Sequence, residues 1–126
     1  MAPLTVIDGS QVGTYVNATA RVLAQLTVTR TGYWAAAAYY HVNSGSEGGS
    51  HQLLADLRFN GTSQAQVSMW RQAGANDGAV GVYSPAVLIS AGQVIQLFGS
   101  KGHNEQANLD QLGLRAYFMP MFDYRI

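Results

Sequence analysis

Residues 51–69, HQLLADLRFNGTSQAQVSM, alternate between apolar and polar side chains on both sides of an Asn-Gly pair. A period of two predicts strands with one buried face, and Asn-Gly between two such strands is typical of a tight hairpin turn. A plain two-residue loop places Leu57 opposite Gln64, whereas a shift of one residue places it opposite Ala65. Since that shift exchanges the two faces of a strand, the pattern favours a three-residue loop, or a two-residue turn followed by a bulge.

Four consecutive alanines lie between aromatic residues in GYWAAAAYYHV, residues 32–42. Alanine is the best helix former, so a buried helical turn is one interpretation. The segment nevertheless follows a turn glycine and separates with a period of two into two sets, neither of which forms a helical stripe. We therefore predict a strand whose alanines let a bulky neighbour or an opposing sheet approach closely.

Other short segments also read as strands separated by polar loops. Alternation predicts strands at 21–29 and 108–118, a second hairpin from 84–90 and 93–99 that pairs Ile89 with Val94, and a short last strand at 121–126. Polar loops are expected at 43–50, 71–78 and 99–108. Many short strands without a convincing helix predict an all-β protein, an antiparallel jelly-roll β-sandwich of about eight to ten strands. We expect an N-terminal arm or edge strand at 1–19 and a single jelly-roll domain at 20–126.

Charge excludes several kinds of partner. Only 11% of the 126 residues are charged, and seven basic residues balance seven acidic ones. Nucleic acid is not an expected partner, because phosphate recognition needs a basic patch. Membrane insertion is not expected either, since no stretch approaches the ~20 apolar residues of a membrane-spanning helix. The first ten residues lack the basic and apolar regions of a secretion signal. A surface with so few charges resists self-association weakly, which favours a homo-oligomer.

The order of the strand motifs resembles a known family. TGYWAAAAYYHV, LRFNG, YSPAVLISAGQVIQLFG and LRAYF are similar, in this order, to strands of the jelly-roll modules shared by the complement globular heads and the tumour necrosis factor superfamily. The similarity covers roughly residues 20–120. Its glycine-rich, cysteine-free form looks more like bacteriophage versions of the module than vertebrate ones. In phage proteins such modules form tail-fibre tips, baseplate parts and capsid decorations.

This resemblance implies a function. We expect a non-catalytic structural protein of a bacteriophage virion, made in the host cytoplasm and displayed on the virion surface as capsid decoration, head fibre or tail component. Its expected partners are copies of itself, as a homotrimer, and other virion proteins. The chain contains no collagen-like or coiled-coil stalk sequence, which favours a small protein seated on a larger assembly. The alternative is a receptor-binding adhesin tip that recognises a saccharide or protein on the host surface.

No motif of nucleophilic, metal or nucleotide chemistry occurs in the chain. His103 and Glu105 have the residue types of metal ligands, but a solvated loop explains them better. Asp56 and Arg58 suit a solvated strand face better than a catalytic pair. A triad of Asp56, His51 and a serine would need geometry that the sequence does not indicate. We therefore expect no catalytic residues, no metal site and no cofactor.

Surface recognition is what remains, and two groups of residues are candidates. Trp and Arg are typical interface anchors, and an aromatic ring beside polar loop groups can stack on a sugar. The candidate binding residues are Trp70, Arg71, Asn76, Asp77, His103 and Asn104, with a core position as the alternative for Trp70. The candidate subunit-interface residues are Trp34, Tyr39, Tyr117, Phe118, Phe122 and Tyr124.

Overall fold

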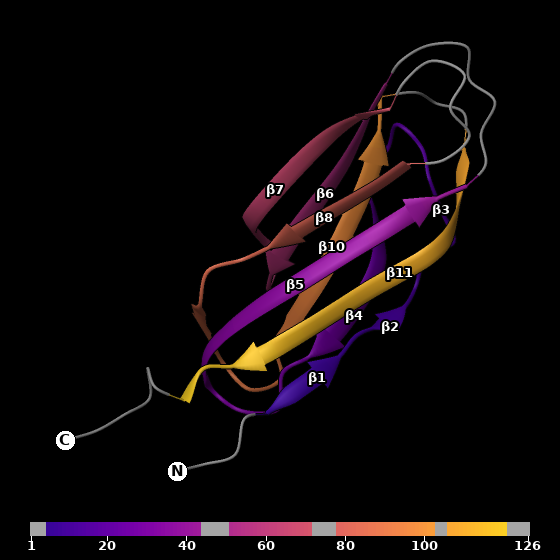
Figure 1. Ribbon diagram of the computed structural model, residues 1–126. Coiled ribbons are helices and arrows are strands. Elements are labelled where there is room, and N and C mark those ends of the chain that lie inside the picture. Colours follow the sequence, from indigo (N-terminus) through magenta and orange to yellow (C-terminus); the bar gives the residue numbers. More distant parts are fainter. Residues whose placement is uncertain (1–4, 44–50, 72–77, 103–105, 121–126) are drawn as a thin grey trace.

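Two antiparallel sheets face each other in the computed structural model, which describes residues 5–43, 51–71, 78–102 and 106–120 (Figure 1). The first sheet has the order β1-β11-β5-β8, with β3 also paired to β11 and β9 to β5, and the second has the order β2-β4-β10-β6-β7. The strands are β1 (Val6–Asp8), β2 (Ser10–Gln11), β3 (Tyr15–Val16), β4 (Arg21–Thr27), β5 (Gly32–Val42), β6 (His51–Phe59), β7 (Thr62–Arg71), β8 (Gly78–Tyr83), β9 (Val87–Ile89), β10 (Val94–Lys101) and β11 (Ala107–Phe118). The described residues contain eleven strands and no α-helix, so the predicted antiparallel jelly-roll sandwich is confirmed.

The alanine-rich segment is a strand along its whole length. β5 lies between β11 and β8, and its residues alternate between the core and the outer face of the first sheet. Trp34, Ala36, Ala38, Tyr40 and Val42 are buried, whereas Ala37 and Tyr39 are exposed. The alternative of a helical turn is therefore excluded.

The β6–β7 hairpin has the second of the two predicted geometries. Asn60 and Gly61 form a two-residue turn with positive φ angles of 51° and 87°, which is the conformation that Asn-Gly favours in a tight hairpin. A bulge between Leu57 and Arg58 then shifts the register, so that Leu57 lies opposite Ala65. The bulge keeps the apolar residues of both strands on the core side.

The predicted second hairpin is wrong. β9 pairs with the start of β5 in the first sheet, whereas β10 lies between β4 and β6 in the second. The turn at residues 90–93, in which Gln93 N donates to Ser90 O at 3.0 Å and Gly92 has a φ of 91°, carries the chain between sheets. Ile89 and Val94 are consequently not partners. Alternation alone does not distinguish a hairpin from such a crossover, because both bury one side of each strand.

Two further regions differ from the expected strand pattern. β8 forms within the segment after the polar loop, where no strand was predicted, and buries only Val80 and Val82. Residues 6–16 contribute three short edge strands, with β1 and β3 on β11 and β2 on β4. These short strands raise the number to eleven, above the expected eight to ten.

A cluster of aromatic rings closes one end of the core. Trp34 meets Phe118 edge-on at 5.3 Å between ring centroids, and Trp34 Nε1 donates to Arg30 O at 3.0 Å. The Arg30 guanidinium lies 4.0 Å from the centre of the Phe118 ring. Gly32 has a φ of 153°, and a Cβ there would lie 2.5 Å from Phe118 Cε1. Only glycine therefore fits between the strand and this ring.

Candidate functional site

The outer face of the first sheet carries exposed apolar side chains instead of the usual polar ones. Tyr39, Tyr83, Leu88 and Val6 expose 47%, 81%, 59% and 42% of their surface. Strand register places these residues, together with the half-buried Tyr33 and Tyr117, on one side of the sheet. We call these six residues the aromatic face: Val6, Tyr33, Tyr39, Tyr83, Leu88 and Tyr117.

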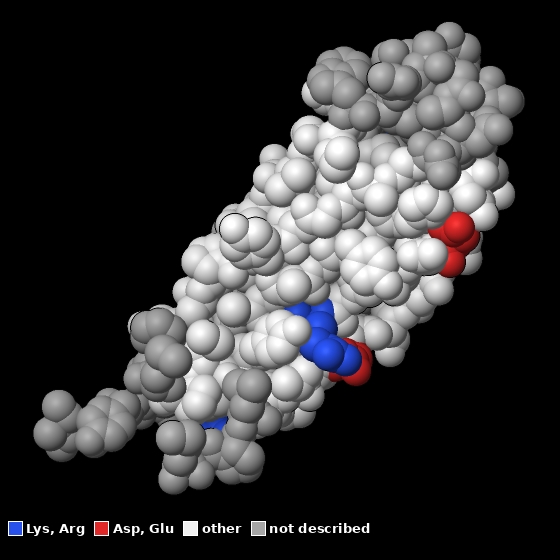
Figure 2. All heavy atoms as spheres, viewed as in Figure 1, with Lys and Arg blue, Asp and Glu red and all other residues white. Residues whose placement is uncertain are grey.

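Small residues fill the outward positions between the tyrosines of the aromatic face and leave room there. The outward positions of β5, β8 and β11 include Ala35, Ala37, Ala79, Gly81 and Gly113. Tyr39 lies across Gly113, where a Cβ would overlap its ring. In Figure 2 the visible face is almost entirely uncharged, with one adjoining blue and red group, one further red group at the side and a small blue area near the lower end. A contiguous apolar patch of this kind marks an interaction site.

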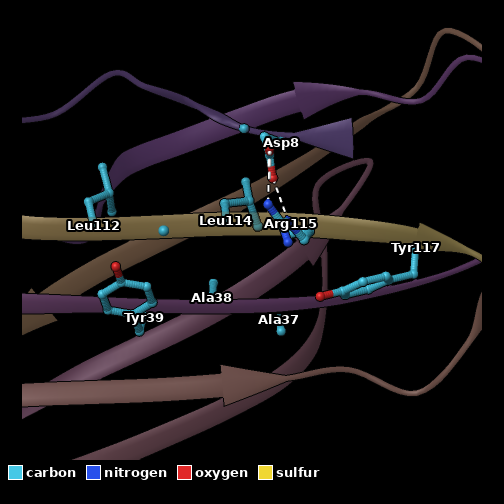
Figure 3. Close-up of a pocket in the computed structure, with 10 residues that line it drawn as sticks. Asp8, Ala37, Ala38, Tyr39, Leu112, Leu114, Arg115 and Tyr117 are labelled. Atoms are coloured by element: carbon cyan, nitrogen blue, oxygen red, sulfur yellow. Dashed lines mark hydrogen bonds and ion pairs between the residues drawn. The ribbon is translucent and has the colours of Figure 1, made fainter. Parts of the chain in front are cut away.

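An open hollow of about 500 Å³ lies on the aromatic face between Tyr39 and Tyr117 (Figure 3). Ala37, Ala38 and Gly113 contribute to its lining, and the Asp8–Arg115 pair borders it. A second hollow of about 320 Å³ lies on the other side of Tyr39 and is lined by Gln11, Leu109, Asp110, Gln111 and Leu112. Tyr39 therefore stands between two depressions into which side chains of a partner can fit.

The Asp8–Arg115 ion pair joins β1 to β11 at the rim of the larger hollow. Arg115 Nε donates to Asp8 Oδ1 at 2.6 Å, and Arg115 Nη2 donates to Asp8 Oδ2 at 3.3 Å. The hydrogen bond from Arg115 lowers the pKa of Asp8, and the same bond raises the pKa of Arg115. Since the Asp8 pKa is lowered, the stabilisation is present above the ordinary pKa of an aspartate. It is lost as the pH falls through the lowered value.

A histidine and an aspartate form a second polar pair at the rim of the smaller hollow. His41 Nδ1 is hydrogen-bonded to Asp110, and both side chains are partly exposed. The β5–β11 register shifts between Leu109 and Gln111, which makes Asp110 the extra residue of a bulge. These two pairs are thus satisfied within the protomer, which lowers the cost of covering the face.

A smaller apolar surface lies at the free edge of the second sheet. Among the described strands β7 pairs only with β6, and Val67 and Met69 are 38% and 49% exposed. Register places them opposite Ala55 and Leu53, which are buried on the core side. We call Val67 and Met69 the edge patch. In the described part of the chain no further strand lies beyond β7.

The predicted interface residues divide into buried and accessible ones. Trp34 and Phe118 have no exposed surface, so the structure corrects the expectation that they contact another subunit. They are core residues because alternation turns them inward, away from the aromatic face. Tyr39 and Tyr117 lie on the aromatic face, and Phe122 and Tyr124 lie outside the described residues.

The predicted binding residues are largely outside the described part of the chain. The backbone of Trp70 and Arg71 belongs to β7, opposite Gln52 and His51, so this segment extends the strand and does not open a loop. Asn76, Asp77, His103 and Asn104 fall outside the described residues. The sequence analysis missed Tyr83 and Leu88, whose strands were not assigned to the first sheet.

Asp56 is not the solvated carboxylate that the sequence suggested. Its side chain is 1% exposed, accepts a hydrogen bond from Arg58 Nε at 2.7 Å and another from Ser63 Oγ at 2.5 Å. Both oxygens are thus occupied within the fold. Among the described residues there is no group of three or more metal-ligating side chains, and no helix is long and apolar enough to cross a membrane.

Comparison with known proteins identifies the fold. No family model and no curated protein matches the chain. Among solved structures, the Eiger TNF from S. frugiperda aligns with a TM-score of 0.50 at 11% identity, over 76% of this chain and 64% of that one. The arabinose-bound α-L-arabinofuranosidase MgGH51 aligns with a TM-score of 0.50 at 12% identity, over 90% of this chain and 23% of the enzyme. The latent PorU dimer from Porphyromonas gingivalis aligns with a TM-score of 0.48 at 12% identity, over 91% of this chain and 12% of that one.

The chain thus spans less than two thirds of each of these proteins. At such low identity the likeness concerns the fold alone, which is a TNF-like jelly roll.

Proposed function

We propose that this TNF-like jelly roll is a non-catalytic structural protein that assembles into a homotrimer on the surface of a bacteriophage particle. The observation that carries the self-association is the aromatic face, with exposed tyrosines, small residues between them and polar pairs that satisfy each other. The assignment to a capsid decoration, head fibre or tail component rests on the sequence resemblance described above. The same resemblance supplies the trimeric state.

Two different apolar surfaces on one protomer suit a closed ring. In a cyclic trimer each subunit uses one patch toward one neighbour and a different patch toward the other. The aromatic face and the edge patch belong to different sheets and are the exposed apolar surfaces that such contacts need. We assign the aromatic face of one protomer to the edge patch of the next.

Burying these surfaces in an interface is favourable because they are mainly apolar and few charged side chains have to give up their hydration. About 25 cal/mol is gained per Å² of apolar surface removed from water. The ionisable side chains beside the aromatic face, Asp8, Arg115, His41 and Asp110, already have partners within the protomer. A neighbouring subunit can cover them without leaving a charge unpaired.

Light scattering with a charged variant tests this proposal. Ala37 lies at the centre of the aromatic face and is exposed. Ala37→Arg should convert a wild-type trimer into a monomer at micromolar concentration, because a second guanidinium would be buried beside Arg115, whose carboxylate partner Asp8 is already engaged. The matched control is Thr27→Arg, an exposed position on β4 of the second sheet, which should remain trimeric.

Three results would contradict the proposal. A wild-type protein that is monomeric in the same experiment excludes the trimer, and a trimeric Ala37→Arg variant excludes the aromatic face as its interface. Circular dichroism should give matching β-spectra for all three proteins. Specific binding of the wild type to host cells would favour an adhesin tip over a purely structural role.

A further inference from the structure

A row of polar side chains crosses all five strands of the second sheet on its outer face. Register places Ser10 beside Gln25, Gln25 beside Gln96, Gln96 beside Arg58, and Arg58 beside Ser63. We call these five residues the polar row. Neighbouring strands lie about 4.8 Å apart, so the polar row extends over about 19 Å. It lies on the outer face of the second sheet, whereas the edge-patch residues Val67 and Met69 share the side of Ala55 and Leu53, which face the core.

Arg58, in the polar row, is held in one orientation by its surroundings. Its Nε donates to the buried carboxylate of Asp56, and its guanidinium lies 3.8 Å from the centre of the Phe98 ring. Ser63 Oγ donates to the other oxygen of Asp56. The bulge between Leu57 and Arg58 lies next to this cluster, and bulges often re-aim side chains at binding sites.

The exposed end of Arg58 is available to a ligand. Its side chain is 31% exposed, and within the described part of the chain its two terminal nitrogens make no hydrogen bond. A guanidinium fixed in advance loses little conformational entropy when a ligand binds. The buried Asp56 therefore positions Arg58 and does not itself need to touch a ligand.

The remaining members of the polar row offer both donors and acceptors. Gln96 Nε2 donates to Gln25 Oε1 at 3.1 Å, which leaves the amide nitrogen of Gln25 and the amide oxygen of Gln96 for other partners. Ser63 gives its proton to Asp56 and keeps lone pairs for accepting. Donors and acceptors thus alternate along the polar row, and each hydroxyl of a ligand can both donate and accept.

We propose that the polar row is a binding site for a neutral saccharide. Charge complementarity supports an uncharged ligand, because Asp56 balances Arg58 and the other members carry no charge. A polyanion needs several uncompensated basic residues, which this row does not contain. A chain of sugar hydroxyls matches alternating donors and acceptors across neighbouring strands, with Arg58 as the fixed contact.

An array printed with neutral and acidic oligosaccharides tests this site, using the wild-type protein and two variants. The wild type should bind neutral glycans specifically. Gln25→Ala/Gln96→Ala removes two exposed amides without opening the core and should lower the apparent affinity at least about tenfold. Arg58→Lys keeps the charge but loses the planar donor fork, and should cause a loss of similar size. Gln106→Ala changes an exposed glutamine just before β11, outside the polar row and both hollows, and should bind like the wild type.

Several outcomes would overturn the proposed site. Absence of a specific neutral glycan excludes it, as does binding to acidic glycans alone. Unchanged binding by Gln25→Ala/Gln96→Ala also excludes it, and so does an equal loss in the control Gln106→Ala. Light scattering on the same samples reports the trimer separately, so failure of the saccharide site and failure of the assembly remain distinguishable.

Discussion

At the scale of single residues, Tyr40 connects the two sheets. It belongs to β5 of the first sheet, and its hydroxyl donates to Leu54 O of β6 at 2.7 Å, with Ser100 O of β10 within reach at 3.3 Å. Its ring is fully buried. Burial raises the pKa of Tyr40 well above its ordinary value near 10, because the phenolate would lose its hydration.

Replacing Tyr40 tests this connection. Tyr40→Phe should lower the free energy of unfolding by about 1–2 kcal/mol at neutral pH, because buried carbonyls lose a donor. Above about pH 10 the unfolded wild type releases the Tyr40 proton while the folded protein keeps it, so wild-type stability should decrease with rising pH. Urea unfolding between pH 7 and pH 11 should show a weaker decrease for the variant. Tyr83→Phe, at an 81% exposed position, is the control, and an equal effect of both changes would contradict the assigned role.

At the scale of elements, the turn of the β6–β7 hairpin determines which side of β7 faces the core. Asn60 has a φ of 51°, a left-handed conformation that asparagine tolerates and β-branched residues avoid. Asn60→Val should therefore lower the free energy of unfolding by about 1–2 kcal/mol. Thr62→Val, the same side chain one residue beyond the turn, serves as the control. Thermal unfolding of the two variants measures the difference, and equal melting temperatures would exclude a strained turn.

The same hairpin illustrates how much of the fold the sequence predicts. The strand register at 51–69 was predictable because the Asn-Gly pair indicates a tight turn and the alternation of the two flanking segments indicates which residues face the core. The pairing of β9 was not predictable. Whether β9 pairs with β10 or with β5 depends on whether the chain crosses between the sheets after β9, and alternation is the same in both cases. β8 was not predicted because its outward residues Ala79 and Gly81 are not polar, so the segment does not alternate between apolar and polar residues.

The candidate site was predictable only in part for a related reason. The interface prediction selected aromatic residues by composition, and alternation then divides them: Tyr39 and Tyr117 face outward, while Trp34 and Phe118 face the core. Applied to residues 32–42, the period-two pattern already separates Trp34 from Tyr39. The polar row required tertiary information, because its five members come from five strands and become neighbours only through the register of the sheet.

At the scale of the whole molecule, the aromatic face and the edge patch define the geometry of the proposed assembly. A contact between one aromatic face and another would be two-fold and would close at a dimer. A contact between the aromatic face and the edge patch of the next protomer continues until the ring closes. A change at Val67 should prevent association in the face-to-edge arrangement and leave association unchanged in the face-to-face arrangement.

Mixing two monomeric variants distinguishes these arrangements. Ala37→Arg disables the aromatic face and keeps the edge patch, whereas Val67→Lys disables the edge patch and keeps the aromatic face. Each alone should be monomeric, and an equimolar mixture should form a one-to-one heterodimer, because one intact face meets one intact edge and no third contact follows. Native mass spectrometry measures the species. A trimeric Val67→Lys variant, or a mixture that stays monomeric, would contradict the face-to-edge contact and would direct attention to a symmetric pairing of the aromatic faces.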